Sequence, residues 1–209
     1  MERSDGIRPE TVTGVVLAGG AARRMGGSDK GLIRLAGRPM IEYVLDALRP
    51  QVGSILINAN RNPDQYARYG IAVIADERTG FQGPLAGMAA AMQSARTEFI
   101  VTAPCDSPFV PADLVRRLGR SLAADRADIG VAHADGRLQP VFTLLRVSLL
   151  GSLIEYLDRG ERKIDLWFSG ERTATADFSD VPEAFLNINT PDDVREIEAK
   201  MREPARAAH

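Results

Sequence analysis

The hydrophobic and polar positions of the first 124 residues follow two alternating patterns. Short apolar runs rich in β-branched residues, of which residues 12–18 are the first, are typical of buried strands. Between these runs, apolar residues recur at helical spacing. We expect strands at 12–18, 54–58, 71–75 and 98–103, a short strand at 32–36, and helices at 39–49, 63–69, 83–95 and 111–124. This alternation predicts an α/β fold with a mostly parallel central sheet covered by helices.

The remaining residues are less regular. Thr190, Pro191 and the acidic residues after them predict the start of a helix that runs to about Met201. Further strands are expected at 127–132, 140–145, 173–178 and 185–189, further helices at 148–157 and from 164, and a rim of the active site at 133–139. Because no linker interrupts the pattern, we expect one domain over residues 1–209, with flexible tails at 1–10 and 203–209.

Composition narrows the possible functions. The net charge of −2 and the lack of a long apolar run give no indication of a nucleic-acid or membrane partner. No signal-like start is visible, and the single cysteine, Cys105, cannot form an internal disulfide, so we expect a cytoplasmic protein. The chain has two histidines, His133 and His209, which disfavours a histidine-rich zinc site. A Ser-His-Asp hydrolase would depend on His133, and no G-x-S-x-G elbow accompanies it.

A glycine-rich loop follows the first predicted strand. Residues 17–31 contain five glycines, and the fixed charges are Arg23, Arg24 and Lys30 against the single carboxylate of Asp29. Glycines let backbone amides approach a ligand closely, and a surplus of cations suits a polyphosphate. The loop matches neither G-x-x-x-x-G-K-[ST] nor G-x-G-x-x-G. It is therefore a third kind of phosphate loop, unless it is an ordinary solvated turn.

Polar residues leave the carboxyl ends of the other predicted strands. Asn58, Asp76 and Asp106 occupy these positions, where parallel α/β sheets bind ligands. Asn58 and Asp76 have the alternative of being turn residues that bond their own backbone. Asp106 lies between Pro104 and Pro108, and it is our choice for a Mg²⁺ ligand because Mg²⁺ prefers one or two carboxylates plus phosphate oxygens. Its alternative is a capping or turn aspartate.

The loop sequence L-A-G-G-x-x-x-R-M-G-G-x-D-K, residues 17–30, resembles that of the molybdenum cofactor guanylyltransferases (MobA). Later motifs that resemble this family, in order, are residues 58–61, 83–87, 104–106 and 187–191. The resemblance implies a three-layer, Rossmann-like nucleotidyltransferase fold. It also implies Mg²⁺-dependent transfer of GMP from GTP to Mo-molybdopterin, with release of pyrophosphate. Other proteins of molybdenum cofactor biosynthesis, or acceptor proteins, are expected as further partners.

The resemblance also implies roles for individual residues. We expect Arg24 and Lys30 to offset charge on the triphosphate, and Asp106 to bind the metal. The expected GTP contacts are Leu17, Ala18, Gly19, Gly20, Lys30, Asn58, Asp76, Gly83 and Asp106. Asn187 and Asn189 would face molybdopterin, although asparagines before a Thr-Pro helix start are also common turn formers.

Two alternatives remain at this point. A molybdopterin cytidylyltransferase or a sugar-phosphate nucleotidyltransferase would share the fold, but those resemble L-A-A-G where this chain has Leu17-Ala-Gly-Gly20. A non-catalytic nucleotide sensor or cofactor-delivery protein is the second alternative. The presence of both Lys30 and Asp106 argues against it, because binding alone does not require a metal carboxylate.

Overall fold

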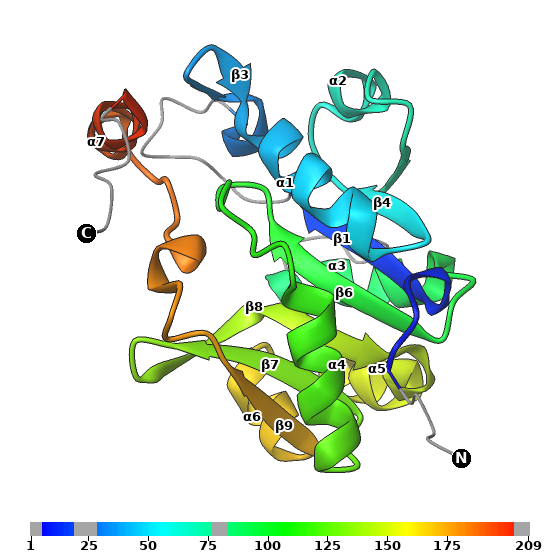
Figure 1. Ribbon diagram of the computed structural model, residues 1–209. Helices are drawn as coiled ribbons and strands as arrows, with labels where there is room; N and C mark the ends of the chain where they lie inside the picture. The colour runs from blue at the N-terminus through cyan, green and yellow to red at the C-terminus, as the bar shows by residue number, and fades with distance from the viewer. Residues whose placement is uncertain (1–5, 19–28, 77–82, 203–209) are drawn as a thin grey trace.

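The structure is a computed structural model that describes residues 6–18, 29–76 and 83–202 (Figure 1). Within these residues, seven strands form one sheet in the order β5-β4-β1-β6-β8-β7-β9. The strands are β1 (Val12–Leu17), β4 (Ser54–Asn58), β5 (Ala72–Ile74), β6 (Phe99–Pro104), β7 (Ile129–Ala134), β8 (Arg137–Arg146) and β9 (Thr173–Asp177). Neighbouring strands are parallel except where β8 pairs with β6 and β7. The expected mostly parallel sheet is confirmed.

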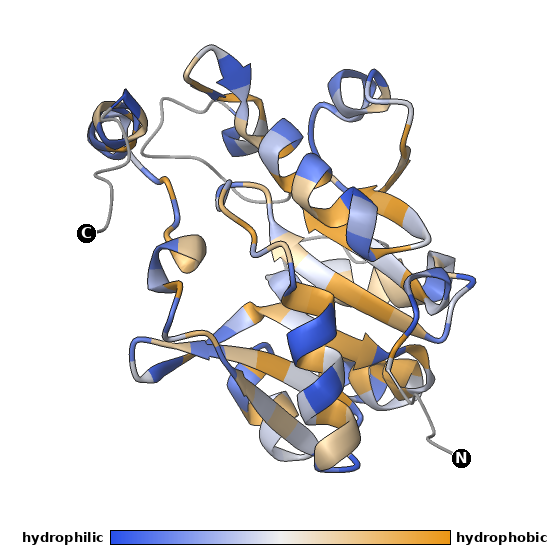
Figure 2. Ribbon diagram, in the orientation of Figure 1, coloured by the Kyte–Doolittle hydropathy of each residue, from blue (hydrophilic) through white to orange (hydrophobic). Residues whose placement is uncertain are grey.

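Helices cover both faces of the sheet and make a three-layer structure (Figure 1). The helices are α1 (Met40–Leu48), α2 (Pro63–Ala67), α3 (Pro84–Ser94), α4 (Leu114–Ala124), α5 (Leu150–Asp158), α6 (Ile164–Ser169) and α7 (Pro191–Arg202). Apolar residues of α1 and α4 pack with Val16 on one face, and those of α3, α5 and α6 pack with Val15 and Leu17 on the other. Because successive strand residues point to opposite faces, β1 contributes to both cores. Figure 2 shows the corresponding apolar colouring of the central strands.

The chain around Lys30 and the connection before α7 are shorter and less regular. A 3-10 turn, η3 (Lys30–Leu32), leads into a two-stranded hairpin of β2 (Arg34–Leu35) and β3 (Arg38–Pro39), where a strand at 32–36 was expected. Further 3-10 turns are η1 (Pro9–Thr11), η4 (Arg49–Gln51), η5 (Val147–Leu149) and η6 (Pro182–Phe185). No helix of the described ranges combines the length and apolar character needed to cross a membrane.

One strand expected from the sequence is absent from the structure. The strand expected at 185–189 does not form: η6 ends at Phe185, and the backbone N–H of Ile188 donates instead to the carbonyl of Asp106 at 2.9 Å. Residues 133–139, expected as a rim of the active site, form a tight hairpin, in which Asp135 and Gly136 have φ values of 50° and 71° and connect β7 directly to β8. Gln139, in the same segment, lines the cleft described below.

The structure describes residues 6–10 of the N-terminal tail expected over residues 1–10. Ile7 packs against the main core, where its side chain lies 3.3 Å from the position that a Cβ would occupy at Gly119 of α4. The turn η1 then leads directly into β1. Ile7 therefore contributes to the packing of α4, because removal of an apolar side chain from water lowers the free energy of the folded protein.

Helix α7 is attached through a small core of its own. Leu35, Met40, Ile188 and Ile197 form this cluster, which is separate from the two cores of the sheet. The start of the helix is capped as expected: the backbone N–H of Asp193 donates to Thr190 Oγ1 at 3.1 Å, and that of Thr190 donates to Asp193 Oδ2 at 2.9 Å. A further N–H from Asn189 is the main reason why the pKa of Asp193 lies below its ordinary value. The cap thus ties α7 to the segment that carries Asn189.

We predict that Ile197→Ala lowers the free energy of unfolding by about 2 kcal/mol, because it removes a buried side chain from the small core under α7. Met201→Ala, on the same helix at an exposed position, is the matched control and should change it by less than about 0.5 kcal/mol. Urea denaturation measures both. Equal effects of the two substitutions would show that the small core does not hold the helix.

Candidate active site

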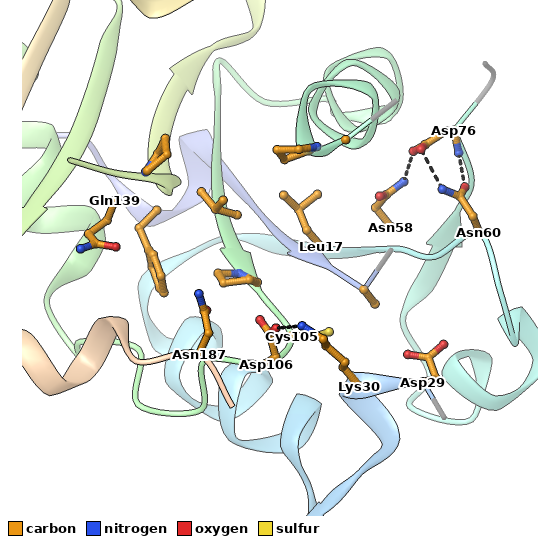
Figure 3. Close-up of a pocket in the computed structure, with 17 residues that line it drawn as sticks. Leu17, Asp29, Lys30, Asn58, Asn60, Asp76, Cys105, Asp106, Gln139 and Asn187 are labelled. Carbon is orange, nitrogen blue, oxygen red and sulfur yellow. Dashed lines mark hydrogen bonds and ion pairs between the residues drawn. The ribbon is translucent and has the colours of Figure 1, made fainter. Parts of the chain in front are cut away.

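A cleft of about 650 Å³ opens at the carboxyl ends of β1, β4 and β6 (Figure 3). Leu17 and Ala18 leave β1, Asn58 ends β4, and the segment from Pro104 to Asp106 ends β6. The other side of the cleft is formed by Gln139, Pro140, Val141 and Phe142 of β8, together with Asn187. This is the edge at which a parallel α/β sheet is expected to bind its ligand.

An ion pair between Lys30 and Asp106 lies at the centre of the cleft. Lys30 Nζ donates to Asp106 Oδ2 at 2.8 Å, and the two side chains are 26% and 12% exposed. The turn η3 carries the lysine, while the aspartate follows the buried end of β6. Lys30 Nζ also donates to Asn189 Oδ1. The segment before α7 therefore contacts the ion pair directly.

A second polar group lies at one end of the cleft. Asn58 Nδ2 donates to Asp76 Oδ1 at 2.9 Å, and Asn60 Nδ2 donates to Asp76 Oδ2 at 2.7 Å. The backbone N–H of Asp76 donates a hydrogen bond to Asn60 Oδ1 at 2.8 Å. These side chains bond one another across the ends of β4 and β5, so the carboxylate of Asp76 is held in a fixed orientation (Figure 3).

Two glycines place helix α3 beside this group. Gly83, just before the helix, has φ 75° and ψ −168°, a conformation that essentially only glycine adopts. At Gly87, a Cβ would lie 2.4 Å from Asn58 Oδ1 and 3.0 Å from Leu17 Cδ2. The helix therefore touches Asn58 through a position that has room for hydrogen alone.

Asn187 of the C-terminal segment lies at the opposite end of the cleft, whereas Asn189 is not among the residues that line it (Figure 3). Asn187 lines the cleft and accepts a hydrogen bond from Ser107 Oγ at 2.6 Å. Asn189 Nδ2 donates to the carbonyl of Asn187 at 3.3 Å, while its oxygen is bonded to Lys30. Both residues thus make long-range contacts that a simple helix-start turn does not require, and the side chain of Asn189 faces Lys30.

Tyr66 and Cys105 lie beneath the turn that carries Lys30. Tyr66 is fully buried, its hydroxyl donates to Asp29 Oδ1, and burial is the main cause of its raised pKa. Cys105 is also buried, and burial together with the neighbouring Asp106 raises the pKa of its thiol well above the ordinary value. The thiol is therefore protonated at neutral pH, as expected of a packed residue and not of a nucleophile.

The structure brings together most of the residues singled out from the sequence. Lys30, Asn58, Asp76 and Asp106 all line the cleft, and so do Leu17, Ala18, Gly83 and Asn187. The expected contacts Arg24, Gly19 and Gly20 lie outside the described residues, as do Arg23, Gly26 and Gly27. Their roles stay predictions.

Sequence reasoning did not assign Asn60, Tyr66 or the close packing at Gly87. A signal existed for Asn60, because Asn58 and Asn60 lie two residues apart where a strand gives way to a loop. None existed for Tyr66, whose partner Asp29 is 37 positions away. A helical glycine such as Gly87 indicates close packing but does not name the neighbour.

Metal ligands are sparse among the described residues, where no group of three or more His, Cys, Asp or Glu side chains is placed to hold an ion. Asp106 contributes a single carboxylate to the cleft centre. This donor set does not fit a cage made only of protein ligands. It fits Mg²⁺ when substrate phosphates and water supply the remaining oxygens.

A cleft at the ends of parallel strands, with an ammonium and a carboxylate at its centre, suits phosphoryl chemistry on a nucleotide. Comparisons with known proteins place the chain among the nucleotidyltransferases: a family model described as a MobA-like NTP transferase domain matches residues 14–172. The chain is 50% identical over 186 residues to a molybdenum cofactor guanylyltransferase of Shewanella sediminis, covering 89% of this chain and 95% of that one. For the enzyme of the same name from Shewanella sp. strain MR-4, the values are 48% over 192 residues, 92% and 98%.

Solved structures of nucleotidyltransferases have the same fold as this chain. The molybdopterin-guanine dinucleotide biosynthesis protein A of Archaeoglobus fulgidus superposes with a TM-score of 0.75 at 26% identity, over 90% of this chain and 98% of that one. A 4-diphosphocytidyl-2C-methyl-D-erythritol synthase of Anaerococcus prevotii shares the fold, with a TM-score of 0.70 at 12% identity over 93% of this chain and all of that one. This chain belongs to the MobA-like NTP transferase family and, within it, to the molybdenum cofactor guanylyltransferases.

We predict that Gly87→Ala lowers the free energy of unfolding by about 1–3 kcal/mol, because the added Cβ overlaps Asn58 Oδ1. It should also weaken nucleotide binding, since Asn58 can relieve the overlap only by leaving Asp76. Gly151→Ala in α5 is the matched control. No atom lies within 4 Å of that Cβ, so the change should stabilise the protein by about 0.5–1 kcal/mol. If urea denaturation shows the same effect for both variants, the close contact at Gly87 is wrong.

Proposed function

We propose that this chain transfers GMP from GTP to the phosphate of Mo-molybdopterin, forming molybdopterin guanine dinucleotide and releasing pyrophosphate. The Lys30–Asp106 pair is the observation that carries the proposal, because it places one cation and one carboxylate at the centre of the cleft. The printed names of the relatives support the choice of substrates. A phosphate oxygen of the acceptor forms a bond to the α-phosphorus of GTP, and the bond from that phosphorus to the oxygen of the leaving pyrophosphate breaks.

We propose that each polar end of the cleft binds a different substrate. In this proposal the nucleotide occupies the end with Asn58 and Asp76, and the acceptor occupies the end with Gln139 and Asn187 (Figure 3). The ion pair lies between the two groups, where the transferred phosphoryl group would sit. An acceptor phosphate is already ionised at neutral pH. The protein therefore needs to position the reactants and neutralise charge, and it needs no general base.

Lys30 and Asp106 have separate roles in this proposal. Lys30 directs its ammonium group to the phosphates of GTP, and Arg24 assists from the glycine loop. Asp106 would hold Mg²⁺, and the bound ion would supply Lewis-acid stabilisation of the charge that develops on the phosphates. Because Lys30 now bonds Asp106 Oδ2, its turn toward the triphosphate frees that carboxylate oxygen.

The cellular setting follows from the same features. The single cysteine is a buried free thiol, which supports a reducing cytoplasm as the location. Other proteins of molybdenum cofactor biosynthesis, or the enzymes that use the cofactor, are the proposed recipients of the product.

Product mass tests the proposed reaction. We predict that Mo-molybdopterin incubated with Mg²⁺ and each of the four nucleoside triphosphates gains the mass of GMP with GTP, with one pyrophosphate released for each product. Leaving out Mg²⁺ should abolish the product. Addition of CMP from CTP, with none of GMP, would move the chain to the cytidylyltransferase alternative, and tight GTP binding with no product would favour the sensor or delivery alternative.

We predict that Asp106→Asn lowers kcat by about 100-fold or more, because the neutral amide removes the charge that holds the metal. The fold should be retained, since the amide keeps the size of the carboxyl group. Asp165→Asn, at an exposed position in α6, is the matched control and should keep wild-type kcat. Initial rates at saturating GTP measure both variants. Wild-type turnover of Asp106→Asn in the presence of Mg²⁺ would remove the metal role of this residue.

A further inference from the structure

The residue that precedes Lys30 in the chain is a buried carboxylate. Asp29 is 8% exposed, and the side chains of the described residues that donate to it are neutral: the Tyr66 hydroxyl to Oδ1, and Asn62 Nδ2 to Oδ2 at 3.2 Å. Hydrogen bonds from buried neutral donors to an ionised carboxylate are among the stronger ones in proteins. Asp29 is therefore held by Tyr66 of α2 and by Asn62, which precedes that helix.

Gly31, the residue that follows Lys30, is closely packed against Tyr66 and Cys105. A Cβ at Gly31 would lie 2.8 Å from the Tyr66 hydroxyl oxygen and 3.2 Å from Cys105 Cβ. The backbone of η3 thus rests directly on the Tyr66 hydroxyl and on Cys105, the buried residue that follows β6. Lys30 lies between two residues that both contact the same hydroxyl group.

We propose that Tyr66, acting through Asp29, is the positioning residue that holds the backbone of Lys30 so that its ammonium group reaches the centre of the cleft. The inference rests on the proposed function, in which Lys30 contacts the triphosphate. A lysine side chain is long and flexible, so the place of its ammonium group depends on how well its backbone is held. Tyr66 is fully buried and is not among the residues that line the cleft, so it can affect triphosphate binding only through the groups it touches.

Residues 58–66, which include Asn62 and Tyr66, also position a carboxylate at the proposed nucleotide end of the cleft. Asn58 and Asn60 orient Asp76, Asn62 bonds Asp29, and Tyr66 follows one helical turn later. The connection from β4 through α2 therefore sets the carboxylate at one end of the cleft and the lysine at its centre. We expect the distance between the two to be fixed by this stretch.

A double-mutant cycle tests the proposal, because a residue that acts through Lys30 should have no effect once Lys30 is gone. The proteins are the wild type, Tyr66→Phe, Lys30→Ala and the double variant. Tyr156→Phe is the matched control. Tyr156 belongs to α5 and does not line the cleft, and its hydroxyl donates at 2.8 Å to the carbonyl of Lys163. Isothermal titration with GTP and Mg²⁺ gives the affinities, and thermal unfolding of each protein reports on the fold.

We expect Tyr66→Phe to weaken GTP binding by up to about tenfold, because the lost hydrogen bond to Asp29 affects GTP only through the position of Lys30. Lys30→Ala should weaken it at least as much, and the double variant should bind GTP as Lys30→Ala does. Tyr156→Phe should bind as the wild type does. Asp29→Asn, alone and combined with Lys30→Ala, repeats the cycle with the partner of Tyr66 in case Tyr66→Phe does not fold.

The possible results distinguish the positioning role of Tyr66 from the proposed function. An equal loss from Tyr66→Phe in the presence and absence of Lys30, or no loss at all, overturns the positioning role and leaves the proposed function intact. A wild-type protein that does not bind GTP contradicts the proposed function, and this inference with it.

Discussion

The structure of the cleft depends on one partly buried ion pair, formed by Lys30 and Asp106. Removing two charges from water is costly, and their attraction offsets the cost only when the geometry is good and further hydrogen bonds complete it. Asn189 provides such a bond to the lysine. The pair is thus held by three segments that are far apart in the sequence, and each segment has its own anchor in the fold.

The anchors differ in kind. Asp106 follows β6, which lies between β1 and β8 in the sheet, so its backbone is fixed by the core. Lys30 lies in a 3-10 turn that rests on Tyr66 and Cys105. Asn189 belongs to a segment that the backbone bond from Ile188 to Asp106 joins to the end of β6, and its neighbour α7 packs on a small core shared with the β2-β3 hairpin. The cleft is therefore assembled from the sheet and from two smaller units that lie beside it.

How much of this could be predicted from the sequence depended on the range of the interaction. Most strands and helices up to residue 124 follow from local periodicity, apart from the hairpin of β2 and β3. The rule that ligands bind at the carboxyl ends of parallel strands already brought Asn58, Asp76 and Asp106 together. The strand expected at 185–189 was wrong because the N–H of Ile188 is taken by the carbonyl of a residue 82 positions earlier, which no local pattern reports. The bond from Tyr66 to Asp29 was missed for the same reason. Two features did carry a local signal. Asp-Gly between two apolar runs favours the two-residue turn at Asp135 and Gly136, and Asn60 lies two residues after Asn58, where a strand gives way to a loop.

In the proposed reaction, Lys30 and Asp106 would give up their mutual bond, the lysine to bind phosphate and the aspartate to bind the metal. A crystal structure of the protein with GTP and Mg²⁺ would show whether this exchange takes place. We predict a triphosphate oxygen within hydrogen-bond distance of Lys30 Nζ and an ion on the carboxylate of Asp106. A triphosphate bound elsewhere, with the Lys30–Asp106 bond unchanged, would contradict it.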